Sequence, residues 1–275
     1  MKFNYSVTIT KEDVGYWSPI MLRGGIMKNM KIAHELGYDA VELQMRNPLD
    51  MEKDEILAYM KETGIKISAL ATGLEYGMNK LSMIADTEEE RNACINRLYE
   101  YVDLAKELNT GVIIGCIRGN MSGTPSANHP KWDVFRDSLK KVCEYGAKFG
   151  VDIYLEAINF YVNNYLCNVH ETVDFIKSMN IPNLKIHIDT HHMSIEDKDM
   201  IESVKYTKGV LGYVHFCENN RKYPGANGVD FEGCLKALKE IDYKGFISFE
   251  CVPYPNELDS AVLGLKYCKE TEKNV

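Results

Sequence analysis

Eight short runs of β-forming residues alternate along this 275-residue chain with longer segments of helical spacing. Such alternation is typical of parallel sheets, because each return to the same edge of a sheet needs a crossover connection, usually a helix. Eight strands and about eight helices are the number that closes a (β/α)8 barrel. We therefore predict a single α/β barrel domain over residues 1–275. The eight runs cover residues 3–9, 39–43, 66–70, 111–115, 152–158, 184–189, 212–216 and 246–250.

A doubly wound open sheet shares this alternation and is the alternative fold. The chain has no GxGxxG after its first strand and no P-loop, so nucleotide-binding folds lose their usual support. The clearest helical segment is 88–108, with Thr87 as its expected N-cap. Residues 119–130 are predicted to form a long loop after the fourth strand rather than a domain boundary.

Composition narrows the class of protein and of partner. A formal net charge of −8 disfavours a nucleic-acid partner. No run of about 18 apolar residues is present, which predicts no membrane span, and residues 1–17 lack the apolar core of a signal peptide. The eight cysteines form no CxxC pair, so we expect reduced thiols and a cytoplasmic location.

Four potential metal ligands stand at the ends of the last four predicted strands: Glu156, Asp189, His215 and Glu250. Barrel active sites form where the carboxyl ends of the strands meet. Three carboxylates and one imidazole make an oxygen-rich set that suits Mn²⁺, Mg²⁺ or Co²⁺ better than a structural zinc. The sequence therefore predicts one divalent metal ion, with Mn²⁺ preferred.

Strand parity places these acids inside the barrel. Side chains alternate between the two faces of a strand, so Glu250 shares the inward face with Ser248, whereas Ile247 and Phe249 face the helices. By the same rule Asp189 is inward and His187 lies deeper on the same face, where we expect a hydrogen-bonded core histidine. Buried carboxylates that converge repel one another, and a divalent cation is the simplest relief.

Several segments carry a likeness to a known family: PIMLRGG at 19–25, VIIGCIRGN at 112–120, LEAIN, DTHHMSIED, HFCENNRKYPGANGVDF and FISFECVP. On these segments the chain resembles the sugar isomerase and epimerase superfamily of xylose-isomerase-like TIM barrels, and within it the ketose 3-epimerases. The resemblance rests on ordered spacings that include Asp189 with His192 and His215 with Arg221. His191 stands where the family usually has Phe.

The resemblance implies metal-dependent 3-epimerisation of a ketose or ketose phosphate through an enediolate. Glu156 and Glu250 would be the catalytic pair that removes and returns a proton. His192 and Arg221 would bind oxygens of a small-molecule sugar. The family also suggests homo-oligomers, either dimers or tetramers.

Two further residues, Glu42 and Arg118, lie near the ends of earlier strands and are additional candidates for substrate binding. Arg118, together with Arg221 and Lys222, is a candidate receptor for a phosphate, although no Gly-rich phosphate turn is evident. The chain departs from the family after Asn159. Many relatives have a segment like Asn-Arg-Tyr-Glu there, whereas this chain has Asn-Phe-Tyr-Val, so the usual ketohexose specificity is in doubt.

Other functions on this scaffold stay open on the sequence alone. A lyase, such as a keto-polyol dehydratase or a subunit that cleaves C-glycosides, needs the same proton removal beside a carbonyl. A nuclease resembling endonuclease IV would need three zinc ions and more ligands than this chain offers. A sugar-binding protein without catalysis would not need two flanking acids.

Overall fold

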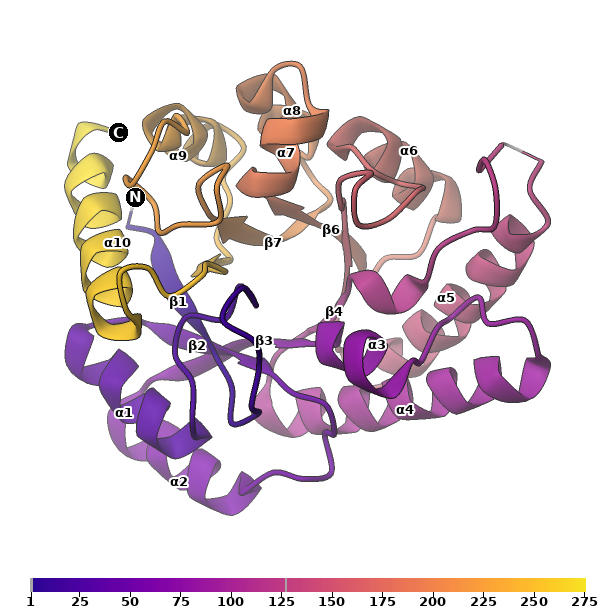
Figure 1. Cartoon of the computed structure of the whole chain (residues 1–275), viewed down its shortest axis with the longest axis horizontal. Helices are drawn as coiled ribbons and strands as arrows, with labels where there is room; N and C mark the ends of the chain where they lie inside the picture. Colours follow the sequence, from indigo (N-terminus) through magenta and orange to yellow (C-terminus); the bar gives the residue numbers. More distant parts are fainter. Residues whose placement is uncertain (1, 127) are drawn as a thin grey trace.

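Over residues 2–126 and 128–275, which the computed structural model describes, eight parallel strands close into a barrel in sequence order (Figure 1). The first strand pairs with both the second and the eighth, which excludes the open-sheet alternative and confirms the predicted barrel. The strands are β1 Asn4–Ile9, β2 Ala40–Gln44, β3 Lys66–Ala71, β4 Val112–Ile114, β5 Ile153–Glu156, β6 Leu184–Asp189, β7 Leu211–Phe216 and β8 Phe246–Phe249.

Helices surround the strands, and the two ends of the chain lie close together beside the last helix (Figure 1). The backbone N–H of Phe3 donates to Oε1 of Glu272 at 2.7 Å, which joins these ends. The helices are α1 Ile26–Leu36, α2 Lys53–Thr63, α3 Gly73–Asn79, α4 Glu88–Leu108, α5 Lys131–Ala147, α6 Val169–Met179, α7 Thr190–Glu196, α8 Met200–Tyr206, α9 Phe231–Glu240 and α10 Glu257–Thr271, with short 3₁₀ turns η1 Cys116–Arg118 and η2 Glu272–Asn274.

The predicted helix over 88–108 is confirmed as α4, and Thr87 caps it in a reciprocal capping box with Glu90. The described residues between 119 and 130 contain no helix or strand, as expected of a loop. Most strand ends match the predicted runs to within one residue, and the larger difference is at β5. The run predicted over 152–158 ends at Glu156, whose carbonyl accepts a hydrogen bond from the guanidinium of Arg118.

The core has two layers. The larger layer lies between strands and helices, and the smaller fills the barrel below the site with Ala69, Ala71, Ile113 and Tyr213. Tyr154 stacks on Tyr213 there with ring centroids 5.4 Å apart. A Cβ at Gly212 would lie 2.5 Å from Cβ of Lys185 and 2.6 Å from the Tyr154 ring, so the packed floor requires a glycine at this position.

Helices long and apolar enough to cross a membrane are absent from the part of the chain that the structure describes.

We expect Gly212→Ala to lower the free energy of unfolding by about 1–3 kcal/mol, because the added methyl group overpacks the floor. Urea-induced unfolding followed by circular dichroism measures this change. Gly228→Ala is the matched control, since a Cβ there meets nothing within 4 Å. Equal stability of the two variants would contradict the packing that we describe.

Candidate active site

Four strand ends bring Glu156, Asp189, His215 and Glu250 together at the barrel mouth. Asp189 on β6 lies opposite His215 on β7, and His215 lies opposite Ser248, two residues before Glu250. One donor atom from each of the four residues lies within 4.8 Å of the others. The structure thus assembles, from four separate strands, the set of ligands that the sequence predicts.

His215 is oriented by a carboxylate behind it. Its Nε2 lies 2.7 Å from Oε2 of Glu42, which also accepts from the hydroxyl of Tyr213 at 3.0 Å. Nδ1 of His215 has no hydrogen-bond partner among the described residues and faces Glu250 Oε2 at 3.6 Å and Asp189 Oδ2 at 3.9 Å. A metal-binding histidine is typically held in this way, through its second nitrogen, by a carboxylate. These residues therefore fit a divalent cation.

Arg221 supplies the positive charge among these acids. Its Nη1 donates to Asp189 Oδ2 at 2.6 Å and to Glu250 Oε2 at 2.9 Å. The residue has a left-handed backbone, with φ of 61°. The buried carboxylate of Glu218 fixes the loop after β7 by accepting from three backbone N–H groups, those of residues 225, 227 and 229. This loop carries Arg221 to the site.

The pKa values of Glu156 and Glu250 are shifted in opposite directions. Burial raises the pKa of Glu156 to about 8, and the negative charge of Glu250 adds to this shift. Burial also disfavours ionisation of Glu250, but His215 and Arg221 beside it hold its pKa below the usual value. One carboxyl group therefore tends to keep its proton at neutral pH while the other is ionised.

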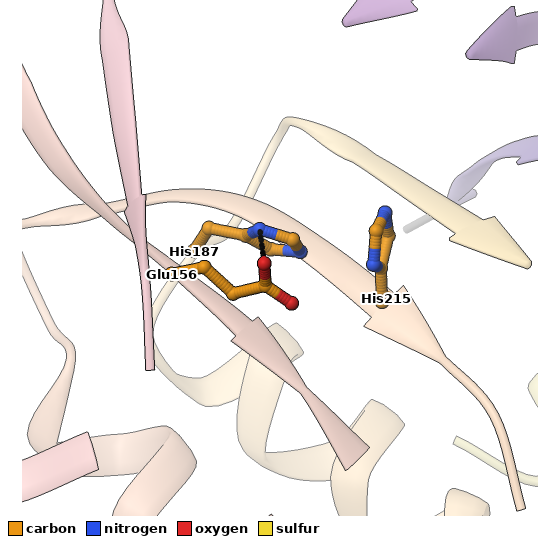
Figure 2. A group of neighbouring side chains, drawn as sticks. All are labelled: Glu156, His187 and His215. Atoms are coloured by element: carbon orange, nitrogen blue, oxygen red, sulfur yellow. Dashed lines mark ion pairs between the residues drawn. The ribbon is translucent and has the colours of Figure 1, made fainter. Parts of the chain in front are cut away.

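Figure 2 shows His187 beside Glu156, on the neighbouring strand, with His215 close by. Nδ1 of His187 lies 3.9 Å from Oε2 of Glu156, and the two imidazole centroids are 4.2 Å apart. His187 is fully buried, as expected, but the expectation of hydrogen bonds is wrong: neither ring nitrogen has a partner among the described residues. The cross-strand neighbour of His187 is a carboxylate just out of hydrogen-bonding reach.

A cavity of about 360 Å³ opens at this end of the barrel. His192 and Arg221 line it together with Glu156, His215 and Glu250, so the two predicted substrate-binding residues lie beside the ligand cluster. Nη2 of Arg221 lies 3.1 Å from Nε2 of His192. Other parts of the wall are apolar and comprise Ile20, Leu74, Ile113, Ile158 and Val162.

Two predicted substrate-binding residues do not line this cavity. Glu42 is fully buried behind His215 and acts on that imidazole instead. Arg118 is also fully buried; its guanidinium bonds the backbone carbonyls of Glu156, Tyr165 and Leu166. The prediction that Arg118 contacts substrate or phosphate is therefore corrected: its side chain runs between backbone segments, where it ties β5 to the loop that comes after it.

Three residues of the site escaped sequence reasoning. The side-chain amide of Asn159 lies 2.6 Å from Nδ1 of His192 and orients that ring. Glu218 holds the loop that carries Arg221. Its position at the start of the glycine-containing segment ENNRKYPGANG could have indicated that its carboxylate binds backbone N–H groups of the loop. A Cβ at Gly115 would lie 2.5 Å from Oε2 of Glu156, so this glycine makes room for the carboxylate.

Comparison with known proteins gives consistent likenesses. The family model described as xylose isomerase-like TIM barrel matches residues 30–271. An L-ribulose 3-epimerase from Methylomonas sp. (strain DH-1) is 30% identical over 237 residues, which are 85% of this chain and 81% of that protein. A ketose 3-epimerase from Arthrobacter globiformis is 29% identical over 82% of this chain and 77% of its own length. A solved D-allulose 3-epimerase from Methylomonas sp., in complex with D-allulose, superposes with a TM-score of 0.79 at 25% identity, covering 98% of this chain and 99% of that one.

Gly115→Ala should displace the carboxylate of Glu156, because its methyl group would occupy the space of Oε2. We expect the affinity for Mn²⁺ to fall at least about tenfold, since ligands must be held within roughly 0.5 Å of their working positions. Calorimetric titration measures the affinity. Gly77→Ala is the control, because a Cβ there meets nothing within 4 Å. Unchanged Mn²⁺ binding in the Gly115 variant would argue against Glu156 as a ligand.

Proposed function

We propose, since this chain belongs to the xylose isomerase-like TIM barrel family, that it is a sugar epimerase that inverts carbon 3 of a ketose. One observation carries the proposal. Two carboxyl groups with opposite pKa shifts, Glu156 and Glu250, line the same cavity within 4.8 Å of each other. Epimerisation needs a base on one face of the carbon and an acid on the other, and this pair supplies both.

Each residue then has a role in proton transfer. Ionised Glu250 takes the proton from carbon 3, and protonated Glu156 returns one to the opposite face; the roles reverse for the other epimer. Arg221 donates hydrogen bonds to the carbonyl side of the substrate, which stabilises the enediolate produced by proton removal. His192 contacts a neighbouring oxygen of the substrate, with its ring held by Asn159.

The cation belongs to the same proposal. Glu156, Asp189, His215 and Glu250 would hold one divalent ion, and the composition of this set favours Mn²⁺, with Mg²⁺ or Co²⁺ as alternatives. When bound, the ion would stabilise negative charge on the enediolate oxygens. Association of the chain into dimers or tetramers stays a prediction from the family resemblance.

We further propose that the substrate is not phosphorylated. Among the described residues lining the cavity, Arg221 is the single arginine or lysine, and Asp189 and Glu250 already engage it. Arg118 is buried against carbonyl groups, and Lys222 lies over the ring of Tyr254 at 3.8 Å. A phosphate against the apolar wall would lose its hydration without gaining an ion pair.

Epimerisation is favoured over the lyase alternative. The named relatives are epimerases that act on ketoses, and the lyase would need a leaving group beside the enediolate. The two reactions share proton removal and differ in the fate of the enediolate, so the product distinguishes them.

With Mn²⁺ and a free ketose such as D-allulose or L-ribulose in D₂O, we expect deuterium at carbon 3 and formation of the epimer. Glu156→Gln and Glu250→Gln should each reduce kcat at least about a thousandfold, because either change removes one proton carrier. Mass spectrometry and NMR measure both effects. Glu240→Gln, an exposed carboxylate on α9, is the control. Normal turnover in either site variant would refute the two-carboxylate mechanism, and loss of water without epimer would favour the lyase.

The apolar wall predicts selectivity at the far end of the substrate. A ketohexose 6-phosphate should have kcat/KM at least about a hundredfold below the free ketose, whereas the 6-deoxyketose should stay within about tenfold of it. Val162→Lys should reduce the difference in kcat/KM between the phosphorylated and the free ketose, because it adds a cation to the cavity wall. Phe160→Lys is the control and should leave this difference unchanged, because Phe160 is exposed and does not line the cavity. Equal use of phosphorylated and free ketoses by the wild type would contradict this specificity.

A further inference from the structure

His187 is a buried polar residue that neither the fold nor the proposed reaction uses. It is fully buried, and neither ring nitrogen has a hydrogen-bond partner among the described residues. A buried polar group without a partner costs about 1–3 kcal/mol, so such a group calls for an explanation. Its neighbours are Glu156, 3.9 Å from Nδ1, and the ring of His215 (Figure 2).

These three side chains converge. One donor atom each of Glu156, His187 and His215 lies within 4.8 Å of the other two. A tetrahedral ion with ligand distances of about 2.0–2.1 Å has ligand atoms about 3.3–3.4 Å apart, so the three donor atoms would move closer together on binding, with a fourth position left for water. All three residues are buried, and Nδ1 of His215 also lacks a partner among the described residues.

The chemistry of this trio differs from that of the four-residue set. Two imidazoles and one carboxylate suit borderline cations such as Zn²⁺, whereas three carboxylates and one imidazole suit harder cations such as Mn²⁺. Glu156 and His215 belong to both sets. Since Nε2 of His215 is held by Glu42, only Nδ1 is free, and one nitrogen binds one ion. The two positions are therefore alternatives.

Arg221 makes the two positions unequal. We call the four-residue set the outer position, and Asp189 and Glu250 belong to it alone. Both carboxylates are already paired with the guanidinium of Arg221, at 2.6 and 2.9 Å. An ion in the outer position competes with this arginine for both carboxylates. An ion held by Glu156, His187 and His215 would leave both ion pairs in place.

We infer that Glu156, His187 and His215 form a second, inner position for a borderline divalent cation of the Zn²⁺ class, exclusive of the outer ion. The inference rests on the proposed outer site only through the two shared ligands. Zn²⁺ there would occupy Glu156 and leave Asp189 and Glu250 with Arg221, so the Zn²⁺-loaded protein is inactive as an epimerase.

Two variants of the full-length protein separate the positions, with Zn²⁺ and Mn²⁺ affinities measured by calorimetry. His187→Gln should weaken Zn²⁺ binding at least about tenfold and change Mn²⁺ binding less than about threefold. Asp189→Asn should do the reverse, because Asp189 belongs to the outer set alone. His170→Gln, an exposed histidine on α6, should change neither affinity. Equal losses for both ions in the His187 variant, or no loss of Zn²⁺ affinity, would overturn the inner position.

X-ray absorption of the Zn²⁺-loaded wild type tests the inference without any variant. Two imidazole ligands support the inner position, and a single imidazole overturns it. The proposed epimerase function is tested separately. If it is wrong, no deuterium will exchange into a ketose with Mn²⁺, whatever the number of histidines that bind Zn²⁺.

Discussion

Three carboxylates held at one end of a barrel are the constraint on which the rest of this structure depends. Glu156, Asp189 and Glu250 repel one another in a largely buried site, and each needs a positive partner. Arg221 forms ion pairs with Asp189 and Glu250, and Glu156 has a raised pKa, so it holds its proton more tightly. The loop braced by Glu218 brings one guanidinium to this place. The same unbalanced negative charge would favour a cation at the site, and it accounts for the opposite pKa shifts of Glu156 and Glu250.

Much of the fold, and the grouping of the four candidate ligands at one end of the barrel, can be predicted from the sequence, because alternation along the chain determines both. Period-two parity alone places Glu156, Asp189 and Glu250 on the inner face, and the structure agrees. Arg118 shows where this reasoning ends. The end of a strand determines how far along the barrel axis a residue lies. The path of a long side chain such as that of Arg118 depends instead on which carbonyl groups lie nearby, here those of Tyr165 and Leu166. The missing hydrogen bonds of His187 likewise depend on small differences in cross-strand distance, which no pattern encodes.

The loop after β5 contributes Ile158 and Val162 to the apolar wall of the cavity. Phe160 and Val162 stand where the family resemblance leads us to expect charged residues. The segment is held in place: the N–H of Phe160 donates to Glu196 at 2.7 Å, and the carbonyl of Val162 accepts from Asn120 at 3.1 Å. These hydrogen bonds fix the backbone of the loop, so its apolar side chains keep a defined place in the cavity wall. In the proposed function, the strand ends supply the reacting groups, while this loop helps to determine which end groups of a sugar fit beside them.

The packed floor of the barrel has a consequence for how the protein works over many turnovers. Tyr154 and Tyr213 stack below the site and pack the barrel interior there, while the cavity lies at the barrel mouth. The two epimers of the proposed reaction differ at one carbon and would bind in this same cavity, so each competes with the other for the site. A catalyst lowers the barrier equally in both directions, and net conversion is therefore set by the equilibrium between the two sugars and by their supply and removal outside.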